Sequence, residues 1–455
     1  MNEQTRPRGN VSFRHAESIL AIGFLAVILL GAVLLALPAA ASNGQGIGFF
    51  NSLFTSVSAV CVTGLVAVDT GTAFSRFGQI VLLTLIQIGG LGFMVFATVL
   101  AVMLGRKISL KERMLIRESM NTSSLSDLAS LTRVYLLLAL AIELAGTALL
   151  SIRFVPVHGW RRGLWMALFH AVSAFCNAGF DLSGQYSSLT SFAGDPLVLL
   201  TVSLLIIFGG IGFSVILETA RNRQGFRHLS LHARIVWITS LALLLAGTVF
   251  YWGIERGNAH TLGPQGEGEK ILNAFFQSVT MRTAGFNSVD LAGLRSGSKL
   301  FSCLLMMIGA SPASTGGGIK TTTVAALALL MFSVVRGRSE VNISRRRLPN
   351  EITRRALAIA VLFLTVLMTG TLLITLFEDG RFPLEDVLFE ATSAIGTVGV
   401  SAIGTPNLST ASRIVLMPMM FLGRVGPLTL AVAVARRQGR VQTTAKYPEE
   451  RIVIG

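Results

Sequence analysis

Four short segments of the chain repeat one pattern, in which a glycine follows a phenylalanine by ten residues. The segments are Phe54–Leu65, Phe169–Phe180, Phe275–Phe286 and Phe389–Val400, and their glycines are Gly64, Gly179, Gly285 and Gly399. The glycines are separated by 115, 106 and 114 residues. Four evenly spaced copies in one chain can surround a single axis, as four identical subunits would.

The residue types in these segments suit the binding of a dehydrated monovalent cation. Such an ion needs its lost water replaced by oxygen dipoles, and rings of backbone carbonyls supply them without a full charge. Glycine adopts backbone angles that other residues resist, so it can turn successive carbonyls toward one line. The candidate ion-binding residues, which would form a selectivity filter, are Val62, Thr63, Gly64, Asn177, Ala178, Gly179, Thr283, Ala284, Gly285, Thr397, Val398 and Gly399.

Glycines in membrane helices often serve only close helix packing, and a single copy would favour that explanation. Each of these glycines, however, follows an apolar stretch too short to span a membrane. A helix that stops inside the membrane and continues as open backbone must line a protein-enclosed, wet cavity. Its C-terminal end is the negative end of the helix dipole, which favours a cation. The four copies together therefore predict a pore.

The residues Gly309–Thr321 interrupt an apolar run that would otherwise span the membrane. Pro312 and the consecutive Gly316, Gly317 and Gly318 cannot hold a regular helix, so we expect a flexible loop across the ion path, acting as a gate. A phosphate-binding loop is disfavoured because no strand precedes it and Ile319 separates glycine from lysine.

Arg424 is a second gate candidate. It follows Gly399 by 25 residues, much as Gly90 follows Gly64 by 26 residues. An arginine in the middle of a membrane helix costs about 2.5–3.5 kcal/mol on insertion scales, so such a residue is a functional candidate. We expect Arg424 to lie beneath the filter as an electrostatic barrier. The alternative is a structural salt bridge or a hydrogen bond to carbonyls of the glycine loop.

Composition identifies a membrane protein. Of 455 residues, 52% are hydrophobic and 13% are charged, and the mean hydropathy is +0.67. A soluble chain carries about 25% charged residues. The net charge of +15 could suggest nucleic acid, but its arginines and lysines cluster between the repeats and near both ends of the chain. The positive-inside rule places these clusters and both termini in the cytoplasm, so we expect no nucleic-acid partner.

We therefore predict an all-α polytopic membrane protein with four pseudo-symmetric repeats around one central pore. Each repeat has a first helix (M1), a pore half-helix with its loop, and a second helix (M2). The expected divisions are residues 1–17 (cytoplasmic N-terminus), 18–104 (repeat 1), 105–133 (linker), 134–220 (repeat 2), 221–233 (linker), 234–335 (repeat 3), 336–355 (linker), 356–435 (repeat 4) and 436–455 (cytoplasmic C-terminal tail). The second helices are expected over residues 77–104, 197–219, 300–335 and 413–435.

The chain resembles the Trk/Ktr/HKT superfamily of potassium transporters over nearly its whole length. The resemblance is carried by the four filter segments, the glycine-rich stretch 313–323 and the run 423–427. The fourth segment, Thr397–Ser401, is also similar to the potassium-channel filter sequence TVGYG. A filter glycine in every repeat implies potassium selectivity. The start of the first helix near residue 18 resembles the shorter Ktr-type membrane subunits.

The resemblance implies potassium uptake across a bacterial plasma (inner) membrane, with a possible dependence on sodium. It implies a gating loop at the glycine run and an Arg282 that points away from the pore and braces its loop. It also implies a homodimer in membrane lipid, with one pore per subunit, docked on a cytoplasmic nucleotide-binding regulatory subunit of the KtrA/TrkA type. The chain itself is expected to bind no cofactor; potassium is the transported ion.

Two other function classes remain to be weighed. A secondary symporter with alternating access would show inverted repeats and several carboxylates inside the membrane. These repeats share one orientation, and the acids within spans are Glu143 and Glu218. An enzyme would need a convergent nucleophile, base and metal set, which the sequence lacks. Asp69, Asp181 and Asp290 follow their filter segments and would form either a weakly acidic vestibule or solvated loops.

Overall fold

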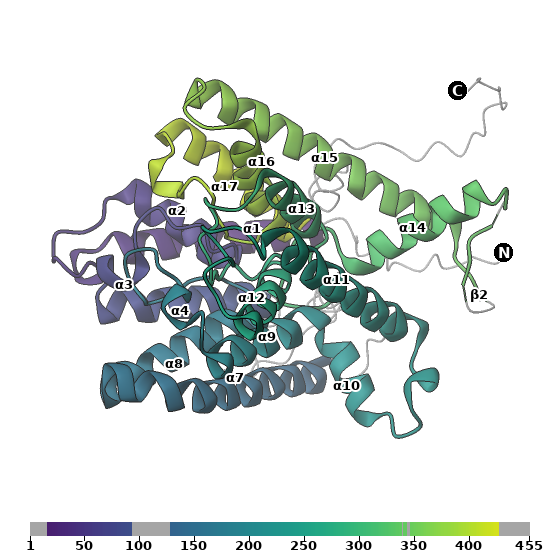
Figure 1. Ribbon diagram of the computed structural model, residues 1–455, viewed down its shortest axis with the longest axis horizontal. Helices are drawn as coiled ribbons and strands as arrows, with labels where there is room; N and C mark the ends of the chain where they lie inside the picture. Colours follow the sequence, from purple (N-terminus) through teal and green to yellow (C-terminus); the bar gives the residue numbers. More distant parts are fainter. Residues whose placement is uncertain (1–15, 93–127, 339, 344–345, 427–455) are drawn as a thin grey trace, which may run out of the picture.

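The computed structural model describes residues 16–92, 128–338, 340–343 and 346–426, and they form a bundle of helices (Figure 1). The longest helices, α7, α11 and α15, run between the two ends of the molecule. In Figure 1, the short helix α3 (Thr70–Ala73) lies at the left end and strand β2 at the right end. The strands β1 (Asn342–Ile343) and β2 (Arg346–Arg347) pair as one antiparallel hairpin.

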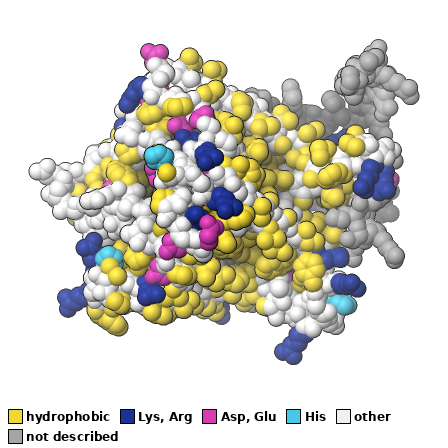
Figure 2. Space-filling view, in the orientation of Figure 1, with side chains coloured by type: hydrophobic (Ala, Val, Ile, Leu, Met, Phe, Trp, Pro, Cys, Tyr) yellow, Lys and Arg dark blue, Asp and Glu magenta, His cyan; other side chains and the backbone are white. Residues whose placement is uncertain are grey.

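The first helices of the four predicted repeats are α1 (Ala16–Ala36), α7 (Leu128–His158), α11 (Leu231–Glu255) and α15 (Asn350–Glu378). Among the described residues, three helical stretches have the length and hydropathy of a membrane span: Thr132–His158, α11 and α15. Large hydrophobic side chains are exposed along these helices at helical spacing, for example Ile238, Leu241 and Leu245. Figure 2 shows hydrophobic side chains spread over the middle of one face, which suits a lipid-facing surface.

The pore half-helices are α2 (Phe49–Val60), α8 (Trp160–Phe175), α12 (Glu267–Thr280) and α16 (Leu384–Gly396). Each packs against the first helix of its own repeat, and glycine allows the close approach in two of these contacts. A Cβ on Gly31 would lie 2.5 Å from the Ser56 hydroxyl, and one on Gly247 would lie 2.2 Å from the Ser278 hydroxyl. The structure confirms that these small residues serve close helix packing.

The second helices differ from the sequence prediction. They are α4 (Arg76–Leu91), α9 (Pro196–Ile211), α13 (Ser296–Met307) with α14 (Thr321–Val335), and α17 (Thr410–Val425). The predicted break in the third repeat is confirmed. The predictions of continuous helices over residues 77–104, 197–219 and 413–435 are wrong, because each helix ends inside its range. Residues 93–104 and 427–435 lie outside the described part of the chain.

A glycine with a positive φ causes each of these unexpected ends. Gly92, Gly212 and Gly426 have φ values of 87°, 99° and 93°, a region that L side chains avoid. After Gly212 the chain continues as α10 (Phe213–Arg221), bent by 97° from α9. All four second helices are therefore broken or end inside their predicted ranges, and not only the third.

Short 3-10 turns connect several of these helices. They are η2 (Pro38–Ala40), η3 (Thr190–Phe192), η4 (Phe226–His228) and η5 (Thr405–Asn407). The core lies around the half-helices, where Phe54, Phe169 and Phe389 are fully buried ten residues before their glycines. In the third repeat the buried ring is that of Phe276 rather than Phe275.

Candidate functional site

The four repeat glycines meet in a closed ring. A Cβ on Gly64 would lie 2.4 Å from the Ala178 carbonyl oxygen, and one on Gly179 would lie 2.8 Å from the Cα of Gly285. The ring continues in sequence order. A Cβ on Gly285 would lie 2.5 Å from the Val398 carbonyl oxygen, and one on Gly399 would lie 2.0 Å from the Thr63 carbonyl oxygen. The four segments therefore surround one axis, and a side chain on any of these glycines would strike the neighbouring segment.

The backbone of each segment has a positive φ at two positions, the glycine and the residue two positions before it. The four glycines have positive φ values of 90°, 69°, 87° and 94° in sequence order. The residues two positions earlier, Val62, Asn177, Thr283 and Thr397, also have positive φ, at 55°, 58°, 68° and 51°. Such angles cost energy in residues that carry a Cβ, and they persist only where the surroundings impose them. Their recurrence at the same place in all four segments gives the four segments one shared backbone geometry.

Hydrogen bonds from behind hold this geometry in the first and fourth segments. The Ser58 hydroxyl accepts a hydrogen bond from the Gly64 amide at 3.0 Å, and the Ser393 hydroxyl accepts one from the Gly399 amide at 3.0 Å. Ser173 holds the matching place in the second segment, but its buried hydroxyl has no hydrogen-bond partner among the described residues. The third segment has Val279 there. The sequence analysis missed these serines, although their position six residues before the glycine is a readable signal.

The residues two positions before the glycines, which we call the innermost positions, have different side chains in the four segments. The Thr397 hydroxyl is buried without a hydrogen-bond partner among the described residues, so its oxygen is available to a ligand. The Thr283 hydroxyl lies 3.3 Å from the side-chain amide of Asn177. Val62 contributes no side-chain oxygen. All four residues are completely buried.

A cavity of about 400 Å³ opens on one side of the glycine ring. All four filter glycines line it, together with Asp181, Asp290 and the loop after Gly399. Burial, together with the nearby charge of Asp69, raises the pKa of the Asp181 carboxyl to about 6. Asp69 itself is an N-cap that accepts hydrogen bonds from Thr72 and from the Tyr186 amide. Two of the three candidate vestibule acids therefore line the cavity, and the third organises its wall.

The glycine-rich loop lies directly against the other side of the filter. A Cβ on Gly316 would lie 2.2 Å from the Thr283 hydroxyl, and one on Gly317 would lie 2.2 Å from the Thr397 hydroxyl. The Gly318 φ of 68° turns the chain toward α14. Thr315 and Ser311 donate backbone hydrogen bonds to the carbonyls of Gly209 and Gly210, at 3.1 and 2.9 Å. The loop is therefore held by the end of α9 and closes the space beneath the innermost ring.

Arg424 joins three repeats beneath the filter. Its guanidinium donates hydrogen bonds to the carbonyls of Thr315, in the glycine loop, and of Gly89 and Gly90, at the end of α4. The sequence left two roles open for this residue, and the hydrogen bond to a glycine-loop carbonyl is the contact observed. The same contact puts its positive charge beside the glycine-rich loop, so the predicted role as an electrostatic barrier is compatible with it.

Arg282 points away from the glycine ring. Its side chain is buried, and its guanidinium donates a hydrogen bond of 3.2 Å to the Ser240 hydroxyl of α11. The partner is therefore a hydroxyl on the first helix of the same repeat. Cys61 and Cys176 are buried free thiols three residues before their filter glycines.

Comparison with known proteins gives one consistent assignment. The model of the TrkH family, described as cation transport protein, matches residues 3–443. The chain is 42% identical over 437 residues to the Ktr system potassium uptake protein B of Bacillus subtilis, covering 96% of each chain. It is 35% identical over 439 residues to the potassium/sodium uptake protein NtpJ of Enterococcus hirae, again covering 96% of each chain. The crystal structure of the potassium transporter TrkH from Vibrio parahaemolyticus superposes with a TM-score of 0.74 at 15% identity, over 96% of this chain and 88% of that one.

Proposed function

Because this chain belongs to the TrkH family of cation transport proteins, we propose that it takes up potassium across the bacterial inner membrane. The ions would pass singly along the axis of the glycine ring, driven by the electrochemical gradient. An inside-negative potential contributes about 2.3 kcal/mol per charge per 100 mV, which is enough to accumulate potassium without an attached ATPase domain.

The observation that carries the proposal is the ring of four glycines with matching backbone angles. Because each glycine lies so close to the backbone of the next segment, carbonyl oxygens from four sides can replace the water of an ion on the axis. The four half-helices end at this ring, so their negative dipole ends favour a cation there. The unpartnered Thr397 hydroxyl supplies one further oxygen at the innermost position.

Two elements would gate this path. The glycine loop at Gly316–Gly318 occupies the space beneath the innermost ring, so it must move before an ion can leave. Arg424 holds the loop through the Thr315 carbonyl and adds a positive charge that opposes cation passage. Opening therefore requires these hydrogen bonds to break, which links the loop to the ends of α4 and α17.

Sodium dependence, dimerisation and regulation belong to the same proposal. The name of the Enterococcus hirae relative includes sodium, and those of the Ktr relatives denote one component of a system. We expect this chain to work as a homodimer with a cytoplasmic nucleotide-binding regulatory subunit of the KtrA/TrkA type. Both termini and the basic linkers would lie in the cytoplasm, where the positive-inside rule puts them.

The test is growth rescue of a bacterium that lacks its own potassium-uptake systems, at low external potassium. The parent chain, produced with its regulatory subunit, should restore growth. Gly64→Ser and Gly399→Ser should not restore it equally, because the two glycines face different neighbours in the ring. Failure of the parent chain to rescue, with its presence in the membrane verified, would contradict the proposed function.

A further inference from the structure

Glu390 is a fully buried carboxylate in the fourth half-helix, nine residues before Gly399. Its two oxygens accept hydrogen bonds from the Ser401 hydroxyl at 2.5 Å and from the Thr405 hydroxyl at 2.6 Å. Both donors lie in the loop that follows the filter glycine and lines the outer cavity. The carboxylate therefore connects the half-helix to the outer rim of the pore.

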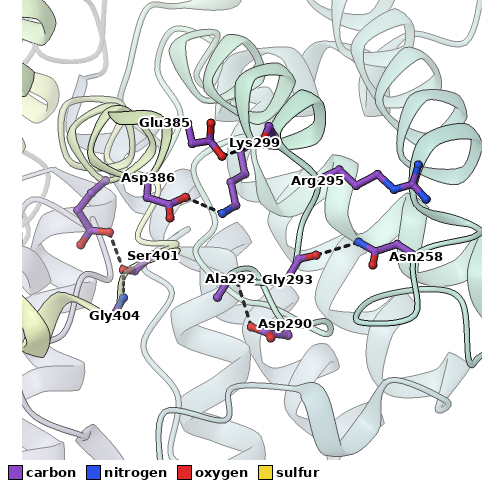
Figure 3. Close-up of polar contacts among 12 residues, drawn as sticks. Asn258, Asp290, Ala292, Gly293, Arg295, Lys299, Glu385, Asp386, Ser401 and Gly404 are labelled. Atoms are coloured by element: carbon purple, nitrogen blue, oxygen red, sulfur yellow. Dashed lines mark hydrogen bonds and ion pairs between the residues drawn. The ribbon is translucent and has the colours of Figure 1, made fainter. Parts of the chain in front are cut away.

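Glu390 is the hydrogen-bond acceptor at both of its oxygens. The Ser401 hydroxyl donates to Glu390 and also accepts a hydrogen bond from the Gly404 amide at 2.8 Å, so it links the carboxylate to the loop backbone. Figure 3 shows Ser401 and Gly404 close together at this turn. A carboxylate offers one acceptor oxygen to each of the two hydroxyls, whereas the amide of a glutamine would present an NH2 donor in place of one of them. Burial makes the loss of either bond costly.

The equivalent positions in the other repeats do not reach their outer loops in this way. Thr55 and His170 hydrogen-bond to carbonyls one turn earlier in their own half-helices, and the third repeat has Phe276 there. The third repeat instead uses Thr280, whose hydroxyl donates to the Phe286 carbonyl at 2.5 Å. Among these four equivalent positions, all in the described part of the chain, only Glu390 in the fourth repeat hydrogen-bonds to the loop that follows its filter glycine.

The half-helix that carries Glu390 is itself fixed at its outer end. Lys299 of α13 forms an ion pair of 2.6 Å with Asp386, and both side chains are largely buried. The Ser296 hydroxyl donates to Glu385 at 2.7 Å (Figure 3). Because α13 belongs to the third repeat, these contacts tie the fourth half-helix to its neighbour. Because its helix is fixed in this way, Glu390 can hold the loop in place instead of moving with it.

We propose that Glu390 is a positioning residue that holds the outer end of the fourth filter segment and so contributes to discrimination between potassium and sodium. Discrimination by a carbonyl ring depends on how the oxygens are held around the ion. Val400 lies between the filter glycine and Ser401, so releasing Ser401 and Thr405 frees the carbonyls of Gly399 and Val400 to shift toward a smaller ion. This inference rests on the proposed potassium uptake.

The experiment compares potassium and sodium uptake by the full chain, with its regulatory subunit, in membranes that contain equal amounts of each variant. Glu390→Gln should lower the ratio of potassium to sodium uptake about tenfold, the equivalent of one lost hydrogen bond to a buried charge. Thr405→Val, which keeps the carboxylate and removes one donor, should lower the ratio by a smaller factor. The matched control is Glu351→Gln, which neutralises an exposed carboxylate on α15, the first helix of the same repeat, and should keep the parent ratio.

A parental ratio in Glu390→Gln, or a reduced maximal rate with that ratio unchanged, would overturn the proposal. If Glu390→Gln does not reach the membrane, Thr405→Val decides: a lowered ratio supports the positioning role, and a parental ratio overturns it. The parent chain distinguishes this failure from failure of the proposed function, because absence of any potassium uptake by the parent would contradict the function itself.

Discussion

The third and fourth filter segments share one backbone geometry but are held in different ways. Each has a threonine and a glycine with positive φ two residues apart. Behind the fourth, Ser393 and Glu390 bind the filter backbone and the outer loop. Behind the third, an apolar Val279 holds the position of the serine.

The second helices of these two repeats also differ. The fourth, α17, is continuous to Val425 and carries Arg424. The third breaks after Met307 and resumes at Thr321, and the loop between them lies under the filter. The comparison teaches that two segments can share one backbone geometry with different supporting contacts. The fourth segment is hydrogen-bonded from behind, and the third repeat supplies the loop that we propose as a gate.

The largest effect should come from placing a side chain inside the ring. Gly399→Ala should abolish potassium-selective uptake, because its Cβ would lie 2.0 Å from the Thr63 carbonyl oxygen. The control is Gly380→Ala in the same repeat, where φ is also positive, at 75°, but no atom lies within 4 Å of the added Cβ. Rubidium uptake, as a substitute for potassium uptake, is measured for both variants. Equal loss in the two variants would show that backbone strain, rather than the clash in the ring, is responsible.

The next largest effect should be at the contact between the two repeats. Arg424→Gln removes the charge and its hydrogen bond to the loop carbonyl of Thr315. Without the regulatory subunit, we expect cation flux to rise about tenfold, as when a hydrogen bond to a charged group is lost. Flux into vesicles containing the chain alone measures this. Flux equal to that of the parent would contradict the barrier role.

A smaller effect should separate a segment supported by a serine hydrogen bond from one that lacks it. Ser393→Ala removes the acceptor for the Gly399 amide, a bond worth about 0.5–1.5 kcal/mol. We expect the potassium-to-sodium uptake ratio to fall a few-fold. The matched variant is Ser173→Ala, whose hydroxyl has no partner among the described residues and should leave the ratio nearly unchanged. Competition of sodium against rubidium uptake reports the ratio. An equal change of the ratio in the two variants would contradict the distinction between the fourth and second segments.

The smallest effect should arise at the innermost position. Thr397→Val keeps the side-chain shape and removes a hydroxyl that has no partner in the described structure. We expect the apparent KM for potassium to rise about twofold, with a smaller change for Thr283→Val, because the Thr283 hydroxyl already contacts Asn177. Initial uptake rates at graded potassium concentrations measure both. A larger effect at Thr283 would reverse this ranking.

Much of this comparison could be predicted from the sequence, because its signals are local and repeated. A glycine that recurs after a short apolar stretch predicts a half-helix and a filter loop, and Pro312 with three glycines predicts a broken helix. The ends of the second helices at Gly92, Gly212 and Gly426 could not be predicted in this way. Within an apolar run, a glycine with positive φ has the same sequence signature as one that only allows close packing.

Contacts between residues that are separated along the chain could not be predicted from the sequence either. Glu390 looks like an ordinary half-helix acid until the loop after Gly399 folds back over it, 11 and 15 residues later. Similarly, the carbonyl partners of Arg424 lie 109 and 335 residues away along the chain. Backbone carbonyls carry no residue-specific signal, so the sequence could indicate that Arg424 needs partners but not which ones it has.

The most direct test of the central claim, that four unequal segments form one ion-binding ring, is anomalous scattering from crystals of the protein grown with rubidium or thallium in place of potassium. We predict peaks on the axis enclosed by Gly64, Gly179, Gly285 and Gly399, within coordination distance of carbonyl oxygens from all four segments. Peaks confined to one or two segments, or bound ions elsewhere with none at the ring, would contradict the account.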